Sequence, residues 1–257
     1  MEWNKIDIEK INRIALLAGE KIMEIYNDAD FSKVVDFKAD HSPLTLADKA
    51  SHNVIEEELF ELGAGLPLLS EEGRTIEYDE RRAWNTFWLV DPLDGTKEFI
   101  KRNGEFTVNI ALIEQGTPVL GVIYAPATNK LYYAIKGQGA WKREGGNTIK
   151  IQTGKKENNW IAVGSRSHSA PEEQTVLSKY PVTDSVSIGS SLKFCLLAEG
   201  QADIYYRHGP TMEWDTGAGQ AILEAAGGKM LDNQGNLFVY NKQSLTNSSF
   251  LCLSHIR

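Results

Sequence analysis

Two aspartates follow a short apolar run in the segment Trp88-Leu89-Val90-Asp91-Pro92-Leu93-Asp94. The apolar run predicts a buried strand over 87–90, and Pro92 with the following Gly95 predicts a sharp turn directly after it. Such a turn would bring the two carboxylates together at the carboxyl end of the strand. Carboxylates so placed repel each other unless a cation lies between them, and ligation by oxygen alone suits Mg²⁺. The segment therefore predicts a magnesium site, with a solvent-exposed Asp-Gly turn as the alternative interpretation.

Further acidic residues stand at the ends of predicted elements. Glu71 and Glu72 follow a predicted strand at 66–69. Asp215 stands at the start of a predicted helix, where the free N–H groups and the helix dipole favour an anion. Asp48 lies in the first turns of another helix. Each has an ordinary explanation as a first-turn acid or an exposed loop pair, but together with the aspartates above they predict one cluster of carboxylates.

The overall charge argues against some classes of partner. The chain of 257 residues has a formal net charge of −8, which disfavours nonspecific binding to nucleic acid polymers or to anionic lipid. An anionic substrate would need local cations or a metal to attract it. At 42% hydrophobic and 24% charged residues, the composition is that of an ordinary soluble globular protein.

The cysteines and the N-terminus bear on the compartment. Cys195 and Cys252 are far apart and lie among apolar neighbours, which favours core thiols in a reducing cytosol over a zinc or redox site. Charged residues interrupt the N-terminal apolar residues, so the sequence predicts neither a signal peptide nor an integral membrane segment. We therefore expect a cytoplasmic protein.

The spacing of apolar residues predicts the elements that position these acids. Apolar residues recur at helical spacing over 8–25 and 50–62, which predicts two amphipathic helices, the second ended by Gly63 and Gly65. From 87 to 141, apolar segments alternate with turns at short intervals. This pattern predicts an antiparallel meander with strands at 87–90, 107–114, 119–125 and 130–135.

A polar stretch at 155–159 is the best candidate boundary between two halves. It divides an N-terminal α+β subdomain (1–157), with most of the acids, from a C-terminal α/β subdomain (158–257), the two forming one catalytic unit. In the second half we predict strands at 160–163, 186–188, 202–206 and 250–253, and helices at 171–179, 191–199 and 214–226. The fold class is α/β, with helices covering sheets in layers.

Two motifs together resemble the signatures of the lithium-sensitive inositol monophosphatase superfamily. They are Asp91-Pro92-Leu93-Asp94-Gly95-Thr96 and Trp214-Asp215-Thr216-Gly217-Ala218-Gly219. Supporting segments occur along nearly the whole chain, at 42–48, 69–72, 88–124, 165–168 and 189–195. The continuation from Gly95 through Arg102 favours the bacterial bisphosphate nucleotidase branch over the inositol phosphatases. The resemblance implies a layered α-β-α-β-α sandwich of the sugar-phosphatase type, and often a homodimer; it leaves peripheral association with the inner membrane open.

The resemblance also implies a role for each matching residue. Two or three Mg²⁺ ions would be held by Glu71, Asp91, the Leu93 carbonyl, Asp94 and Asp215, with Asp91 shared between two ions. All of these except Asp91 would also contact the substrate. Asp48 and Thr96 would activate the attacking water, and the amides of Gly95 and Thr96 would hold phosphate oxygens. The positions that match contacts to the nucleotide and its second phosphate are Ser190, Lys193 and Arg207, with His168 nearby.

Elementary chemistry agrees with this allocation. Hydrolysis of a phosphomonoester needs shielding of the phosphoryl oxygens, a nucleophile near neutral pH and stabilisation of the leaving alkoxide, and paired divalent ions supply all three. No covalent-phosphate signature occurs, which favours direct in-line attack by water. Considered without the resemblance, Lys193 and Arg207 could equally be exposed cations in weak surface pairs, and His168 could be a packing residue.

We therefore interpret the chain as a Mg²⁺-dependent phosphatase that converts adenosine 3′,5′-bisphosphate to AMP and phosphate. An inositol or sugar monophosphatase with the same metal cluster is the alternative among enzymes, and a noncatalytic sensor of Mg²⁺ or nucleotide is the alternative of another class. One position departs from the superfamily: Gly217 stands where alanine is usual. The glycine costs the helix roughly 1 kcal/mol but removes no ligand.

Overall fold

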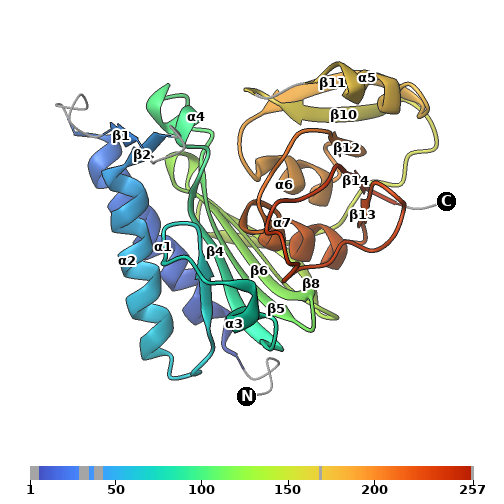
Figure 1. Cartoon of the computed structure of the whole chain (residues 1–257). Helices are drawn as coiled ribbons and strands as arrows, with labels where there is room; N and C mark the ends of the chain where they lie inside the picture. The colour runs from blue at the N-terminus through green and yellow to red at the C-terminus, as the bar shows by residue number, and fades with distance from the viewer. Residues whose placement is uncertain (1–5, 29–34, 38–42, 168–169, 256–257) are drawn as a thin grey trace.

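The structure is a computed structural model that describes residues 6–28, 35–37, 43–167 and 170–255 (Figure 1). The N-terminal elements are α1 (Ile8–Tyr26), β1 (Val35–Phe37), β2 (Pro43–Thr45), α2 (Leu46–Glu61), β3 (Leu68–Ser70), α3 (Tyr78–Arg81), β4 (Thr86–Asp94), α4 (Thr96–Ile100), β5 (Thr107–Glu114), β6 (Thr117–Ala125), η3 (Pro126–Thr128), β7 (Lys130–Ile135), β8 (Gly139–Glu144) and β9 (Asn147–Ile151). The C-terminal elements are β10 (Trp160–Ser165), α5 (Pro171–Leu177), β11 (Val182–Ile188), α6 (Leu192–Ala198), β12 (Ile204–Arg207), α7 (Glu213–Ala225), β13 (Lys229–Asp232) and β14 (Phe250–Leu253).

Two large sheets organise these elements. The first has seven strands in the order β3-β4-β5-β6-β7-β8-β9, and all neighbours except the parallel pair β3 and β4 are antiparallel, as in the predicted meander. The second has five strands in the order β11-β10-β12-β14-β13, with parallel pairs around β10 and antiparallel pairs around β14. The predicted boundary at 155–159 falls between the last strand of the first sheet and the first strand of the second.

Helices and sheets alternate in layers (Figure 1). α1 and α2 cover one face of the seven-stranded sheet, α6 and α7 lie between its other face and the five-stranded sheet, and α5 packs against the outer side of the five-stranded sheet. Because side chains alternate along a strand, β4 contributes to the hydrophobic cores on both faces of its sheet. Trp88 and Val90 pack in the core under α1 and α2, and Leu89 packs in the core under α7. This order confirms the predicted α-β-α-β-α sandwich.

The strand that carries Asp91 does not end at Val90, so that part of the prediction is wrong. β4 continues to Asp94 and pairs with β5 on both sides of an irregularity between the two aspartates. Pro92 has no N–H to donate to the ladder, so the strand deviates there without stopping. The sharp turn comes at Gly95, whose φ of 93° lies in the left-handed region that favours glycine, and α4 begins directly after it.

Gly217 has a packing reason that the sequence did not reveal. α7 crosses the seven-stranded sheet so closely that a Cβ at Gly217 would lie 2.9 Å from Leu89 Cδ2 and 3.2 Å from Ala111 Cβ. The sheet also has a glycine where the helix approaches. A Cβ at Gly121 of β6 would lie 2.5 Å from the Ala218 carbonyl oxygen. Missing side chains on both surfaces therefore let the helix that carries Asp215 lie directly on the sheet that carries Asp91.

The structure also bears on the expectations for a membrane segment and for the two cysteines. No helix among the described residues combines the length and apolarity needed to cross a bilayer. Cys195 and Cys252 are both free and buried, which confirms their interpretation as core thiols. Burial raises the pKa of both thiols well above the usual value, so neither is a reactive thiolate.

Candidate active site

A pocket of about 460 Å³ lies between the two sheets and gathers most of the predicted site. The seven-stranded half contributes residues from the ends of β3 and β4 and the start of α4, and the other half contributes residues from α6, β12 and α7. Of the predicted site residues, Glu71, Asp91, Leu93, Asp94, Gly95, Thr96, Ser190, Lys193, Arg207 and Asp215 line the pocket. Asp48 lies behind Thr96, and His168 lies outside the described residues.

Three aspartates line this pocket and influence one another's pKa: Asp91 is buried, and Asp94 and Asp215 are half-buried. Burial, followed by the charges of Glu71, Asp94 and Asp215, raises the pKa of Asp91 well above its usual value. Burial and the charge of Asp94 likewise raise the pKa of Asp215, while burial raises that of Asp94 against the opposing effect of Lys193. The carboxylates are therefore near enough to penalise one another's ionisation.

Neighbouring polar groups orient these acids. The Leu93 N–H donates to Asp91 Oδ1 at 3.0 Å, and the Met212 N–H donates to Asp215 Oδ2 at 2.9 Å. Asp215 thus also has the ordinary role of a first-turn capping acid, which the sequence had offered as an alternative. The cap leaves it on the pocket wall, so both roles hold at once.

Two residues that the sequence analysis missed connect the halves of the pocket. The Ser191 hydroxyl lies 2.7 Å from Asp94 Oδ2 and 2.9 Å from the Asp215 carbonyl oxygen. Asn109, opposite Asp91 on β5, donates to Ser191 Oγ at 2.9 Å and to Asp94 Oδ2 at 3.4 Å. An asparagine within a strand carries no motif of its own. The only sequence signal for Asn109 was the predicted pairing of its strand with the strand that carries Asp91.

Asp48 and Thr96 form the second functional feature. Thr45 and Asp48 make a capping box at the start of α2, in which the Thr45 N–H and hydroxyl both donate to Asp48 Oδ2, at 2.8 and 2.5 Å. The Thr96 hydroxyl lies 3.5 Å from the other carboxylate oxygen, Oδ1. Burial, more than the opposing hydrogen bonds from Thr45, raises the pKa of Asp48 to about 6, which suits a group that accepts a proton near neutral pH.

Cations occupy the wall formed by the C-terminal half. Lys193 and Arg207 are only 6% and 8% exposed, which excludes the alternative of exposed surface cations. The Lys193 ammonium donates to the Ser190 carbonyl oxygen at 2.5 Å, and burial lowers its pKa although Asp94 opposes the shift. Ser190 itself has a φ of 49°, and its hydroxyl bonds to Thr107 at 2.9 Å.

The donor chemistry of the pocket fits a hard divalent cation. The acids supply oxygen ligands only, and a cation would relieve the mutual repulsion that raises their pKa values. Among the described residues, however, no three carboxylate, thiol or imidazole groups are gathered into a formed metal site. Like charges repel, so carboxylates that share a pocket without a cation have no reason to close around a common point. The predicted metal centre stays a prediction.

Comparison with known proteins agrees with this arrangement. The chain is 50% identical over 246 residues to the 3′(2′),5′-bisphosphate nucleotidase CysQ of Salmonella typhimurium, which covers 95% of this chain and 98% of that protein. It is 48% identical over 244 residues to CysQ of Escherichia coli strain K12, with 95% and 98% covered. The crystal structure of CysQ from Bacteroides thetaiotaomicron superimposes with a TM-score of 0.87 at 43% identity, covering 99% of this chain and 100% of that one. Residues 5–255 match the model of the inositol monophosphatase family, and the chain belongs to that family.

Proposed function

We propose that this protein is a Mg²⁺-dependent phosphatase that removes the 3′-phosphate of adenosine 3′,5′-bisphosphate, giving AMP and inorganic phosphate. Relatives at 48–50% identity over nearly the whole chain are named 3′(2′),5′-bisphosphate nucleotidases. The single observation that supports this substrate most directly is the pairing of two nearly buried cations, Lys193 and Arg207, with a group of acids across one pocket. A bisphosphate needs both groups in one pocket, because one phosphate must bind the metal that the acids hold and the other must bind a cation of the protein.

The metal ligands in this proposal are the acids at the ends of β3 and β4 and the start of α7. Glu71, Asp91, the Leu93 carbonyl, Asp94 and Asp215 would hold two or three Mg²⁺ ions, with Asp91 shared between two of them. Bound there, Mg²⁺ supplies charge neutralisation at the phosphoryl oxygens and at the leaving oxygen, and it makes the attacking water more acidic.

The residues of the chain then have separate tasks. Thr96 accepts a proton from the attacking water as its own hydroxyl proton passes to Asp48, whose raised pKa of about 6 lets it take up that proton. The amides of Gly95 and Thr96, at the start of α4, hold phosphate oxygens. A Cβ at Gly95 would lie 3.1 Å from both the Glu105 carbonyl oxygen and Ser190 Cβ, so close packing, like the positive φ, requires glycine at this turn.

The C-terminal wall would recognise the nucleotide. Arg207 presents a planar fork that matches the oxygens of the 5′-phosphate, and Lys193 adds a point charge from the start of α6. Ser190 lies in the turn between β11 and α6, on the same wall, and contributes its hydroxyl. An inositol or sugar monophosphatase would use the same acids but would have no use for a second cationic position.

A panel of phosphomonoesters tests the proposal. Phosphate release from adenosine 3′,5′-bisphosphate should exceed release from inositol 1-phosphate, should require Mg²⁺, and should be inhibited by Li⁺. Asp91→Asn should abolish turnover while the circular dichroism spectrum stays unchanged. Preference for inositol 1-phosphate would favour the polyol alternative, and tight nucleotide binding without phosphate release would favour a sensor.

A further inference from the structure

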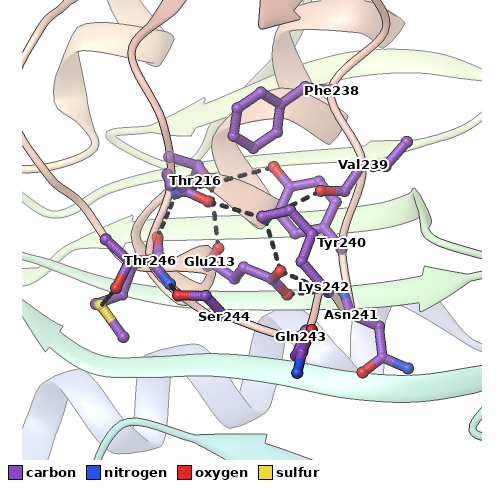
Figure 2. A network of polar contacts seen from close by, with 12 residues as sticks. Glu213, Thr216, Phe238, Val239, Tyr240, Asn241, Lys242, Gln243, Ser244 and Thr246 are labelled. Atoms are coloured by element: carbon purple, nitrogen blue, oxygen red, sulfur yellow. Dashed lines mark hydrogen bonds and ion pairs between the residues drawn. The ribbon is translucent and has the colours of Figure 1, made fainter. Parts of the chain in front are cut away.

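The first turn of α7, which carries Asp215, is held by a distant segment of the chain. Residues 241–247, here called the clamp, run alongside this turn and bond to it repeatedly (Figure 2). The Glu213 N–H donates to the Leu245 carbonyl oxygen at 2.9 Å, and the Asn247 N–H donates to the Thr211 carbonyl oxygen at 2.8 Å. The clamp therefore fixes the backbone on both sides of the point where α7 begins.

Glu213 is the central acceptor of this arrangement. Its carboxylate is completely buried and accepts from the backbone N–H groups of Asn241 at 2.8 Å and Lys242 at 3.0 Å (Figure 2). The Lys242 ammonium donates to the same carboxylate at 2.6 Å. These are charge-assisted hydrogen bonds, which are stronger than neutral ones. Glu213 does not line the pocket, whereas Asp215, two residues further along, does.

The residues that flank Asp215 are held from the same side. Asn247 Nδ2 donates to the Met212 carbonyl oxygen at 2.7 Å and to Thr216 Oγ1 at 3.2 Å. Met212 in turn donates its N–H to the Asp215 carboxylate at 2.9 Å. A short chain of hydrogen bonds thus runs from the clamp to the carboxylate itself.

The other side of the clamp is attached to the N-terminal half. Arg81, at the end of α3, donates to the side-chain oxygen of Asn241 at 2.9 Å and to the Lys242 and Gln243 carbonyl oxygens at 2.6 and 2.9 Å. Asn241 Nδ2 returns a hydrogen bond to the Arg81 carbonyl oxygen at 2.8 Å. The clamp therefore joins the segment that follows Glu71 to the helix that carries Asp215.

We propose that Glu213 is a positioning residue that sets the Asp215 carboxylate in the geometry needed to bind the metal. A buried ion pair is weak evidence of added stability, because desolvation offsets much of its attraction, so a role in fixing geometry accounts better for its burial. Glu213 touches neither the pocket nor the reacting atoms and acts only through the backbone of α7. The inference rests on the proposed function, in which Asp215 is a metal ligand.

Binding of Mn²⁺ to the full chain without nucleotide, followed by the electron paramagnetic resonance of free Mn²⁺, tests this role without requiring activity. Glu213→Gln removes the charge and keeps the size, and it should weaken Mn²⁺ binding about tenfold, as loss of a group that orients a ligand typically does. Asp203→Asn is the matched control. Asp203 is also completely buried and accepts from one lysine, Lys156 at 3.1 Å, and one backbone N–H, that of Ile161 at 2.8 Å, and neither partner belongs to α7.

The outcomes separate the two proposals. Weaker Mn²⁺ binding by Glu213→Gln with unchanged binding by Asp203→Asn supports the positioning role. Unchanged binding by Glu213→Gln, or equal weakening in both variants, overturns it. Asp215→Asn serves as a third arm: if it binds Mn²⁺ like the unaltered protein, the metal assignment in the proposed function fails as well. Should Glu213→Gln not fold, Lys242→Gln replaces it, with a smaller loss expected and unchanged binding again overturning the role.

Discussion

At the scale of single residues, Thr96 is the link between the pocket and Asp48. Its hydroxyl lies 3.5 Å from Asp48 Oδ1, while Thr45 occupies the other carboxylate oxygen. Thr96→Val keeps the shape and removes the proton path, so we expect kcat to fall about 10²-fold or more, as loss of general-base assistance typically causes. Steady-state phosphate release at saturating Mg²⁺ measures this. Thr96→Ser keeps a hydroxyl and should retain most of the rate; equal rates for the valine variant and the unaltered protein would contradict the relay.

Arg207 should decide between substrates. If its guanidinium binds the second phosphate of the nucleotide, Arg207→Ala loses charge-assisted hydrogen bonds worth about 1.5–3 kcal/mol, which corresponds to about a 10- to 100-fold loss in kcat/KM for adenosine 3′,5′-bisphosphate. Inositol 1-phosphate has no second phosphate, so its hydrolysis should change little. Arg207→Lys keeps the charge but not the fork and should fall between them. Parallel losses on both substrates would rule out a selective role for Arg207.

The sequence revealed the acids more readily than the groups that orient them. Asp91 and Glu71 each stand just after a short apolar run, and such a position can be recognised from the sequence alone. Ser191 and Asn109 act through a contact between residues 82 positions apart, which no local pattern records. Glu213 was also missed, because its partners at Asn241 and Lys242 lie on a segment without a motif.

At the scale of elements, the packing of α7 on β6 depends on Gly121. An added Cβ would meet the Ala218 carbonyl oxygen at 2.5 Å, and a backbone atom cannot rotate away as a side chain can. We expect Gly121→Ala to lower the free energy of unfolding by about 1–3 kcal/mol, the usual cost of overpacking. Chemical denaturation measures the loss.

Gly164 provides the matched control for that prediction. It also lies within a strand, β10, but an added Cβ there would meet nothing within 4 Å. Gly164→Ala should therefore leave stability unchanged or slightly raised, because alanine restricts the unfolded chain. Similar losses in both variants would mean that any side chain at a strand glycine destabilises the sheet, and the close approach of α7 would not be the cause.

Elements with a strong apolar period were predictable, and those shaped by contacts were not. Residues 130–135 and 250–253 form β7 and β14 as predicted, because each is a short apolar segment bounded by polar or turn residues. β13 was missed, since Lys229 and Asp232 at its ends conceal a strand that exists through pairing with β14. β4 was predicted too short because proline usually ends a strand, whereas here β5 continues to pair beyond it.

At the scale of the whole molecule, the two halves bring like charges together in one pocket, so the metal-free fold should respond to pH. The folded-state pKa of Asp48, about 6, lies above its usual value of 3.8. Its contribution to stability is fully present below pH 3.8 and is lost as the pH rises through 6. The difference corresponds to about 3 kcal/mol, at about 1.36 kcal/mol per pKa unit. The raised pKa values of Asp91, Asp94 and Asp215 act in the same direction.

The melting temperature measured in EDTA should therefore fall as the pH rises from 3.8 through about 6, and Asp48→Asn should make that fall shallower. Mg²⁺ should raise the melting temperature most at the alkaline end, because a cation neutralises carboxylates that are ionised and binds only the folded state. The melting temperature is measured against pH both in EDTA and in Mg²⁺, and the difference between the two curves is taken. Groups far from the pocket titrate alike in both curves and cancel; Glu80, whose ion pair with Arg74 lowers its pKa, is one of them. If Mg²⁺ shifts the melting temperature equally at all pH values, its binding does not depend on the ionisation of these acids, and the shared pocket would not be where the cation binds.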